Sequence, residues 1–114
     1  MFKITVDSTS LEKRIAAIAA NSEPMANEIV KNLGVIAHKS ARSNAPVDTG
    51  ALKQSITLEV DGNSAEIGSA LEYAPHLEYG TTSQAAQPYL RPAVRDAQRQ
   101  AKNVLKAVWK QYGN

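Results

Sequence analysis

The chain has 114 residues, of which 43% are apolar, 21% charged and 5% aromatic, and its formal net charge at pH 7 is +2. A chain of this length buries roughly two thirds of its unfolded surface, so we expect a single domain over residues 1–114. Cysteine is absent, which excludes thiolate zinc sites, iron–sulfur clusters, cysteine nucleophiles and disulfides. No apolar run approaches the ~20 residues that cross a bilayer, and the first residues lack the apolar segment of a signal peptide, so we expect no membrane partner.

The first part of the chain predicts one strand and two helices. Residues 2–6 alternate apolar and polar side chains, which is typical of a short, half-buried strand at a sheet edge. Helical spacing of apolar residues over 11–20, after several N-cap candidates, predicts a first helix. A second helix over about 24–45 begins at Pro24 and ends before Pro46. Gly34 lies inside it, either as a weak point or as a close packing contact.

The remaining chain predicts a hairpin, a short helix and a last long helix. Residues 51–55 fit one helical turn capped by Asp48 or Thr49. Residues 55–68 alternate around a turn at 61–63 and predict a β-hairpin. A short helix over about 71–79 ends at Gly80, and after a polar loop a helix over about 92–112 begins at Pro92. The fold class is therefore α+β, a small antiparallel sheet of the N-terminal strand and the hairpin packed against two long helices and shorter helices.

The small net charge conceals two oppositely charged parts of the chain. Residues 1–90 hold seven Lys or Arg and ten Asp or Glu, a net charge of −3, whereas residues 91–114 hold six basic residues and one acidic residue, a net charge of +5. On a helical wheel the six basic side chains fall within about 100°, apart from the apolar face. This basic face is either solvated, or meets phosphates, or meets the acidic part of a neighbouring subunit. Its members are Arg91, Arg95, Arg99, Lys102, Lys106 and Lys110.

Little in the sequence points to catalysis. Asp48-Thr49-Gly50 is the tripeptide that aspartic proteases place at a shared dimer site, but such proteases are nearly all-β, whereas long helices are predicted on both sides here. A helix cap followed by a permissive glycine explains the same residues. The two histidines, His38 and His76, belong to no metal-ligand pattern, and no phosphate loop or nucleophile elbow is present. We therefore expect no enzyme, no metal and no cofactor.

Three strings of residues, in order along the chain, resemble a known family. They are A-P-V-D-T-G-A-L-K-Q-S-I at 45–56, Y-A-P-H-L-E-Y-G-T at 73–81 and Q-P-Y-L-R-P-A at 87–93. Together they resemble the small head–tail joining or tail-completion proteins of long-tailed bacteriophages and prophages, also called minor tail components, in which Phe is commoner at the place of Tyr89. The residues that carry the resemblance are Pro46, Asp48, Thr49, Gly50, Leu52, Ser55, Tyr73, Glu78, Gly80, Thr81, Pro88, Leu90, Arg91 and Pro92.

The resemblance implies a non-catalytic structural protein of the virion, assembled in the host cytoplasm. Such proteins form a ring at the neck, commonly of six subunits, which completes the upper end of the tail. The implied partners are further copies of the chain, the head-connector or head-closure protein, a tail terminator or tail-tube protein, and DNA that passes through the lumen. The alternative, from the residues alone, is a sequence-nonspecific DNA-binding module that uses the basic C-terminal helix.

Ring closure needs two different patches that meet on neighbouring subunits. The basic face is expected either to pair with carboxylates of a neighbour or to line the lumen. The polar loop after Gly80 lacks core-forming side chains, so it is either a docking segment or a plain connection. The candidate carboxylates are Glu59, Glu66, Glu72 and Glu78, and the candidate docking loop comprises Thr81, Thr82, Ser83, Gln84, Ala85, Ala86 and Gln87.

Overall fold

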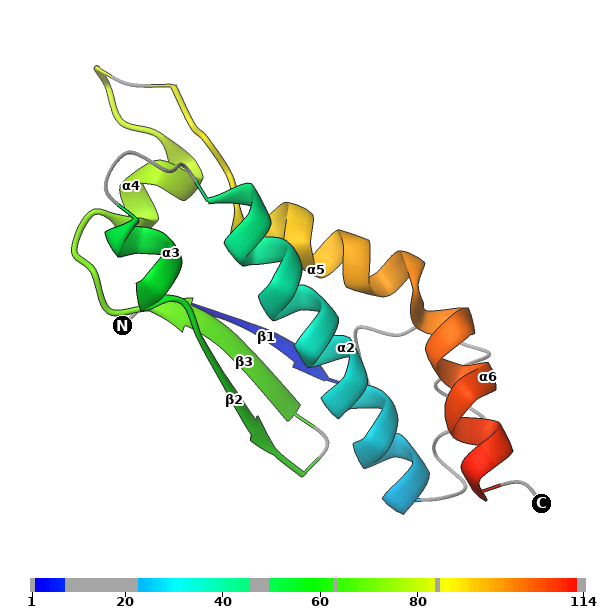
Figure 1. The fold of residues 1–114 in the computed structure, drawn as a ribbon. Helices are drawn as coiled ribbons and strands as arrows, with labels where there is room; N and C mark the ends of the chain where they lie inside the picture. The colour runs from blue at the N-terminus through cyan, green and yellow to red at the C-terminus, as the bar shows by residue number, and fades with distance from the viewer. Residues whose placement is uncertain (1, 8–22, 46–49, 63, 84, 113–114) are drawn as a thin grey trace.

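The computed structural model of the chain describes residues 2–7, 23–45, 50–62, 64–83 and 85–112. The helix expected over residues 11–20 lies outside these ranges. Figure 1 shows how the described elements are arranged. In chain order they are β1 (Phe2–Asp7), α2 (Glu23–Asn44), α3 (Ala51–Ser55), β2 (Thr57–Asp61), β3 (Ser64–Ser69), α4 (Ala74–Tyr79), α5 (Leu90–Arg99) and α6 (Ala101–Tyr112).

The described strands form one antiparallel sheet in the order β1-β3-β2. The register aligns Ile4, Ile67 and Leu58 in one row across the three strands, and these side chains contribute to the core. Because side chains alternate along a strand, the intervening residues point to the opposite side of the sheet. We call that side the outer sheet face; its members include Lys3, Thr5, Thr57, Glu59, Asp61 and Glu66. The predicted hairpin, the edge position of the N-terminal strand and the α+β class are confirmed.

Helix α2 covers the other, inner face of the sheet, and it comes closest at Gly34. A Cβ atom built on Gly34 would lie 2.8 Å from the Cβ of Ala65 and 3.1 Å from Cδ1 of Leu58. Both distances are shorter than ordinary van der Waals contact. Gly34 is therefore a close packing contact, the second of the two interpretations that the sequence left open.

The C-terminal helix differs from its prediction, because it begins at Leu90 and is interrupted at Gln100. The Gln100 N–H is shared between the carbonyls of Ala97, at 3.0 Å, and Asp96, at 3.3 Å, a pattern of a tightened helical turn. The helix path changes direction there, and α5 and α6 both lie against α2 (Figure 1). Residues 99–101 contain neither Gly nor Pro, so hydrophobic periodicity alone predicted one continuous helix.

Small side chains line the contact between α2 and α5. Alanine leaves the two backbones free to approach and still favours the helix. At the edge of this contact the Ser40 hydroxyl donates a hydrogen bond of 2.7 Å to Oδ2 of Asp96. The core of the molecule therefore runs along α2, between the sheet on one side and the C-terminal helices on the other. The buried alanines of this region are Ala37, Ala41, Ala45, Ala93, Ala97 and Ala101.

Candidate assembly interface

The carboxylate of Glu78 holds the base of the loop that joins α4 to α5. Its side chain is fully buried. Oε1 accepts hydrogen bonds from the backbone N–H groups of Tyr89, at 3.0 Å, and Leu90, at 2.8 Å, and Oε2 accepts one from the N–H of Arg91, at 3.1 Å. These N–H groups stand at the start of α5, where a helix has no partner for them. A negative charge from a distant segment thus caps the helix at its positive end.

Arg91 completes this arrangement from the first turn of α5. Its Nε donates to Oε2 of Glu78 at 2.9 Å, and its Nη2 donates to the backbone carbonyl of the same residue at 2.8 Å. The guanidinium also lies over the ring of Tyr79, 4.7 Å from its centroid, within the range of a cation–π contact. We call Glu78 and Arg91 the clasp.

The clasp keeps Glu78 ionised in the interior. Burial by itself raises the pKa of this carboxyl, but the hydrogen bonds from Leu90, Tyr89 and Arg91 outweigh burial and hold the pKa below its usual value. A buried carboxylate is tolerated only where such partners satisfy its oxygens. The clasp is therefore a strong link between α4 and α5.

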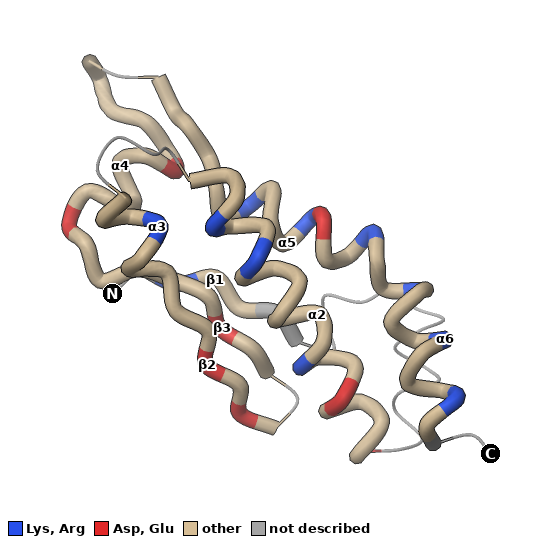
Figure 2. The backbone as a smooth tube through the Cα atoms, viewed as in Figure 1, with Lys and Arg blue, Asp and Glu red and all other residues tan. Residues whose placement is uncertain are grey.

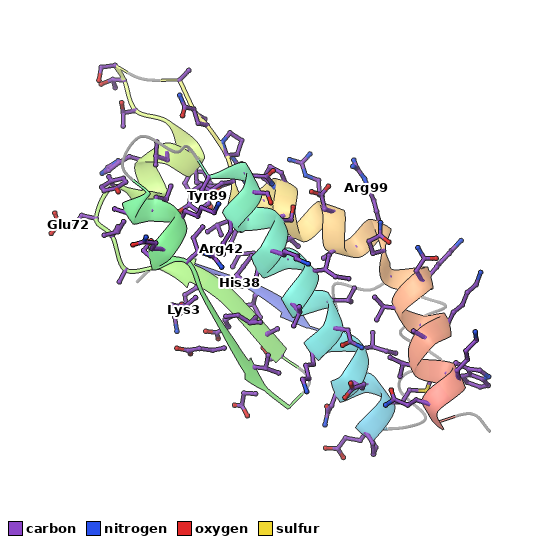
Figure 3. The ribbon with its side chains drawn as sticks, in the orientation of Figure 1. Lys3, His38, Arg42, Glu72, Tyr89 and Arg99 are labelled. Carbon is purple, nitrogen blue, oxygen red and sulfur yellow. The ribbon has the colours of Figure 1, made fainter. Side chains whose placement is uncertain are left out.

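Glu78 was expected to be one of the carboxylates that meet a neighbouring subunit, and its burial shows that this expectation is wrong. Its oxygens are occupied within the subunit, because the start of α5 and Arg91 offer closer partners than any neighbour would. Glu59, Glu66 and Glu72 do lie at the surface, and Figure 3 shows Glu72 pointing away from the body. A signal for the clasp was present in the sequence, since Glu78 and Arg91 belong to successive motif strings.

The loop that the clasp closes, of which residues 80–83 and 85–88 are described, projects beyond the body of the molecule (Figure 1). Gly80 has φ 78° and ψ 175°, a conformation that side chains disfavour, and it turns the chain out of α4. On the returning side the Gln87 N–H donates to the Leu77 carbonyl at 2.7 Å. The described side chains at 81–83 and 85–88 are exposed. The candidate docking loop therefore has a fixed base and an exposed outer part.

A second polar link joins the first motif string to the same end of the molecule. The Ser55 hydroxyl shares a hydrogen bond of 2.7 Å with the hydroxyl of Ser69 and lies 2.7 Å from the Leu52 carbonyl. The Leu71 N–H in turn donates to Oγ of Ser69 at 3.2 Å. Residues of all three strings thus shape the end that carries the loop. Gly50, with φ 75°, stands at the N-cap of α3, and the expected caps at 48 and 49, like Pro46, lie outside the described residues.

The predicted basic face lies along the outer side of α5 and α6 (Figure 2). Two of its members have partners within the subunit, since Arg91 is in the clasp and Nη1 of Arg99 lies 3.5 Å from Oδ1 of Asp96. The basic face as a whole is a long, narrow row of charges, because its residues are spread over two successive helices. Its other members are exposed: Arg95, Lys102, Lys106 and Lys110.

A second basic surface was missed by the sequence analysis. It is a shallow groove of about 450 Å³ between α2 and α3, which we call the α2–α3 groove. Figure 3 shows His38 and Arg42 on the side of α2 nearest to it, and Nε2 of His38 is 2.9 Å from the Ile56 carbonyl. Its cations belong to two helices in a part of the chain with net negative charge, so counting charge along the sequence concealed them. The groove is lined by Val35, His38, Lys39, Arg42, Ser43 and Lys53.

Exposed carboxylates that lie close to one another are found mainly on the outer sheet face. Glu59 is directly opposite Glu66 in the β2–β3 register, and Asp61 follows on the same side of β2. Nζ of Lys3 lies 3.0 Å from Oε2 of Glu66, and this hydrogen bond raises the pKa of Lys3. Glu59, Asp61 and Glu66 therefore present three carboxylates beside the single ammonium group of Lys3.

The described part of the chain contains no group of three or more His, Asp or Glu side chains placed to hold a metal ion. Of its helices, none combines the length and apolar character needed to cross a membrane. The histidines stay apart from each other, since His38 lines the groove and His76 is exposed on α4.

A family model described as "Bacteriophage HK97-gp10, putative tail-component" matches residues 9–80, more than half of the chain. The chain belongs to this HK97-gp10-like family, and the resemblance to phage tail and head–tail proteins is confirmed. The protein is accordingly a component of the virion that contacts other virion proteins. No curated protein and no solved structure matches the chain.

Proposed function

We propose that this tail component forms a ring, of six subunits, that completes the upper end of the tail and joins it to the head connector. In this role the ring leaves a lumen for DNA and has no catalytic activity. Its neighbours are the head-closure or connector protein on one side and the tail terminator or tail tube on the other. Assembly takes place in the host cytoplasm.

The observation that carries the proposal is the clasp beneath an exposed loop. Burying the Glu78 carboxylate costs desolvation, which its hydrogen bonds to the start of α5 and to Arg91 offset, so these bonds fix the base of the loop. Neighbouring helices can be connected by only a few residues, so an anchored longer loop is typical of a functional segment. A loop with a fixed base and small polar side chains suits docking against another virion protein, because little order has to be gained on binding.

The two charge types support a ring. A ring requires a heterologous contact, in which one patch of a subunit meets a different patch of the next. The subunit offers acidic charge on the outer sheet face and basic charge on α2, α3, α5 and α6 (Figure 2). Opposite charges on separate surfaces supply the two different patches that such a contact needs.

The test is the molar mass of the protein in solution, measured by light scattering over a concentration series, alone and with purified tail tubes. The expected result is a ring, or a monomer that becomes a ring only on tail ends. A stable dimer that is indifferent to tails would overturn the proposal.

DNA binding is the second candidate function, and the row of exposed cations on α5 and α6 favours it. Duplex affinity of a phosphate-binding protein falls steeply as salt is raised. For a neck protein we expect the free subunit to bind duplex DNA weakly and tail ends well. Tight, salt-sensitive binding of duplex by the free subunit, without binding to tails, would establish the second candidate instead.

A further inference from the structure

We propose that the α2–α3 groove receives the outer sheet face of a second copy of the chain, and that this is the contact that closes the ring. The inference rests on the ring proposed above and assigns the two patches that such a ring needs. It replaces the basic face of α5 and α6 as the partner of the acidic residues.

The acidic cluster and the basic cluster match in size. Residues directly opposite in an antiparallel pair have Cβ atoms about 5 Å apart, so Glu59 and Glu66 form one compact double charge, with Asp61 about 7 Å further along β2. In the groove, Lys39 and Arg42 are one helical turn apart, about 5–6 Å between Cβ atoms, and Lys53 faces them from α3. Three cations thus meet three carboxylates over a similar area.

The basic face of α5 and α6 matches the acidic cluster poorly. Its cations extend from 91 to 110, about 30 Å along two helices. A row of this length suits a linear phosphate backbone or a lumen wall better than a compact cluster. Two of its members, Arg91 and Arg99, also have acidic partners within the subunit.

Within its own subunit the acidic cluster has only Lys3 as a positive partner among the ion pairs of the described residues. Like charges directly opposite each other destabilise a sheet, and Glu59 stands opposite Glu66. Lys3 makes its ion pair with Glu66, which leaves the cluster with excess negative charge. Cations of a second copy would remove this repulsion, because the groove supplies more positive charge than the cluster's own lysine.

The groove also contains an exposed apolar side chain. Val35 lines it together with the cations and is 49% exposed. Apolar side chains beside charged ones are typical of an interface between polypeptides. The outer sheet face offers Thr57 and Thr5 beside its carboxylates, whose methyl groups can cover such a side chain. A phosphate backbone would use the cations only.

The subunit cannot make this contact with itself. Helix α2 lies on the inner face of the sheet (Figure 1), as the approach of Gly34 to Ala65 shows, so the residues of α2 that line the groove cannot reach the outer sheet face of the same subunit. Their pairing must therefore join two subunits head to tail, which is the geometry that builds rings.

The experiment uses two double charge reversals on the full chain and a matched control. The groove variant is Lys39→Glu with Arg42→Glu, and the face variant is Glu59→Lys with Asp61→Lys. The control, Lys102→Glu with Lys106→Glu, makes the same charge change as the groove variant on the basic face of α6. All six side chains are exposed, and circular dichroism checks that each variant is folded. The measurement is the protein concentration at which rings form, on tail tubes if wild-type rings require them.

We expect the groove variant and the face variant each to raise this concentration by at least ~100-fold, because like charges then meet. An equimolar mixture of the two should recover assembly to within about tenfold of wild type. In the mixture the acidic groove of one variant meets the basic sheet face of the other, and the unchanged groove meets the unchanged face, so an alternating ring with an even number of subunits closes. The control variant should assemble like wild type.

Other results separate this inference from the function on which it rests. If wild-type protein forms no ring, alone or on tails, the proposed function itself is wrong. If wild type forms rings but the control variant loses them and the groove variant does not, the basic face makes the contact and only this inference is overturned. Recovery that fails in the mixture also overturns it, as does a groove variant that assembles normally and loses only duplex DNA binding.

Discussion

At the scale of single residues, we expect substitution of Glu78 to have the largest effect on stability. Its carboxylate accepts hydrogen bonds both from the N–H groups at the start of α5 and from the guanidinium of Arg91. In Glu78→Gln the NH2 group of the new amide faces the N–H groups of Arg91, so that two donors meet without an acceptor. The guanidinium of Arg91 also loses its carboxylate partner. Arg91 is about half exposed, which lessens the cost of leaving it unpaired. We expect the free energy of unfolding to fall by about 2–4 kcal/mol, measured by urea denaturation.

The control for this prediction is Glu72→Gln, which removes an exposed carboxylate close by in the chain. It should change the free energy of unfolding by no more than about 0.5 kcal/mol. Equal effects of the two substitutions would mean that the clasp contributes no more than an ordinary surface charge.

The clasp also predicts how stability depends on pH. The pKa of Glu78 in the folded protein is lowered from the model-compound value of 4.5. Its contribution to stability is therefore present above pH 4.5 and is lost as the pH falls through the lower, folded-state pKa. Urea denaturation of wild type and Glu78→Gln between about pH 7 and pH 3 should show the gap between them narrowing toward acid. A gap that stays constant over this range would contradict the assignment.

Tyr89 predicts a substitution that stabilises the protein. Its side chain is fully buried, and its hydroxyl has no hydrogen-bond partner among the described residues. Burial, with smaller effects of Glu78 and Tyr73, raises its pKa to about 12, so the hydroxyl stays neutral and uncompensated. Tyr89→Phe should increase the free energy of unfolding by about 1 kcal/mol, and Tyr73→Phe, at an exposed position, should leave it unchanged. A loss of stability in Tyr89→Phe would show that the hydroxyl has a partner in the rest of the chain.

At the scale of elements, the approach of α2 to the sheet predicts the effect of a methyl group at Gly34. Alanine favours a helix over glycine by about 1 kcal/mol, but its Cβ would stand 2.8 Å from the Cβ of Ala65, which cannot rotate away. Overpacking of this kind costs about 1–3 kcal/mol. Gly34→Ala should therefore lower the melting temperature despite its better helix propensity.

A double-mutant cycle checks this explanation. Ala65→Gly removes the atom with which the new methyl group collides, so Gly34→Ala should be less harmful in the Ala65→Gly background than in wild type. If the two substitutions add independently, the close approach is not the cause of the destabilisation.

The elements that could be predicted from the sequence are those with a clear period and clear ends. The hairpin alternates around Gly62, and α2 begins beside Pro24 and ends before Pro46, so both were placed to within two residues. The interruption at Gln100 has no such mark, because it depends on how α5 and α6 pack on α2. The sequence identified Glu78 and Arg91 as motif residues but did not predict their contact. Burial of a carboxylate depends on which segments meet in the folded chain.

At the scale of the whole molecule, the net charge of a stretch of the chain did not predict which charged side chains share a surface. The sequence predicted a basic face on one C-terminal helix, and its residues lie along two helices, α5 and α6. It missed the α2–α3 groove, since Lys39 and Arg42 belong to α2 and Lys53 belongs to α3. Strand register places Glu59 opposite Glu66, whereas Glu78 on α4 is interior because the start of α5 packs over it. Tertiary contacts, not composition, define the candidate surfaces.

The projecting loop gives a last prediction at this scale, because its attachment to the body and its outer surface are separate features. Ala85 and Ala86 are exposed and lie outside the clasp, so Ala85→Glu with Ala86→Glu should change the free energy of unfolding by less than about 0.5 kcal/mol. If the loop docks against the tail or the connector, two large charges at the contact should weaken binding to purified tail tubes or connectors by at least ~10-fold. Ala107→Glu with Gln111→Glu, on exposed positions of α6, is the matched control and should bind normally. Normal binding by the loop variant would mean that the loop only connects α4 to α5. Loss of ring formation in the loop variant would mean that the loop contacts a neighbouring subunit of the same ring and not the tail or the connector.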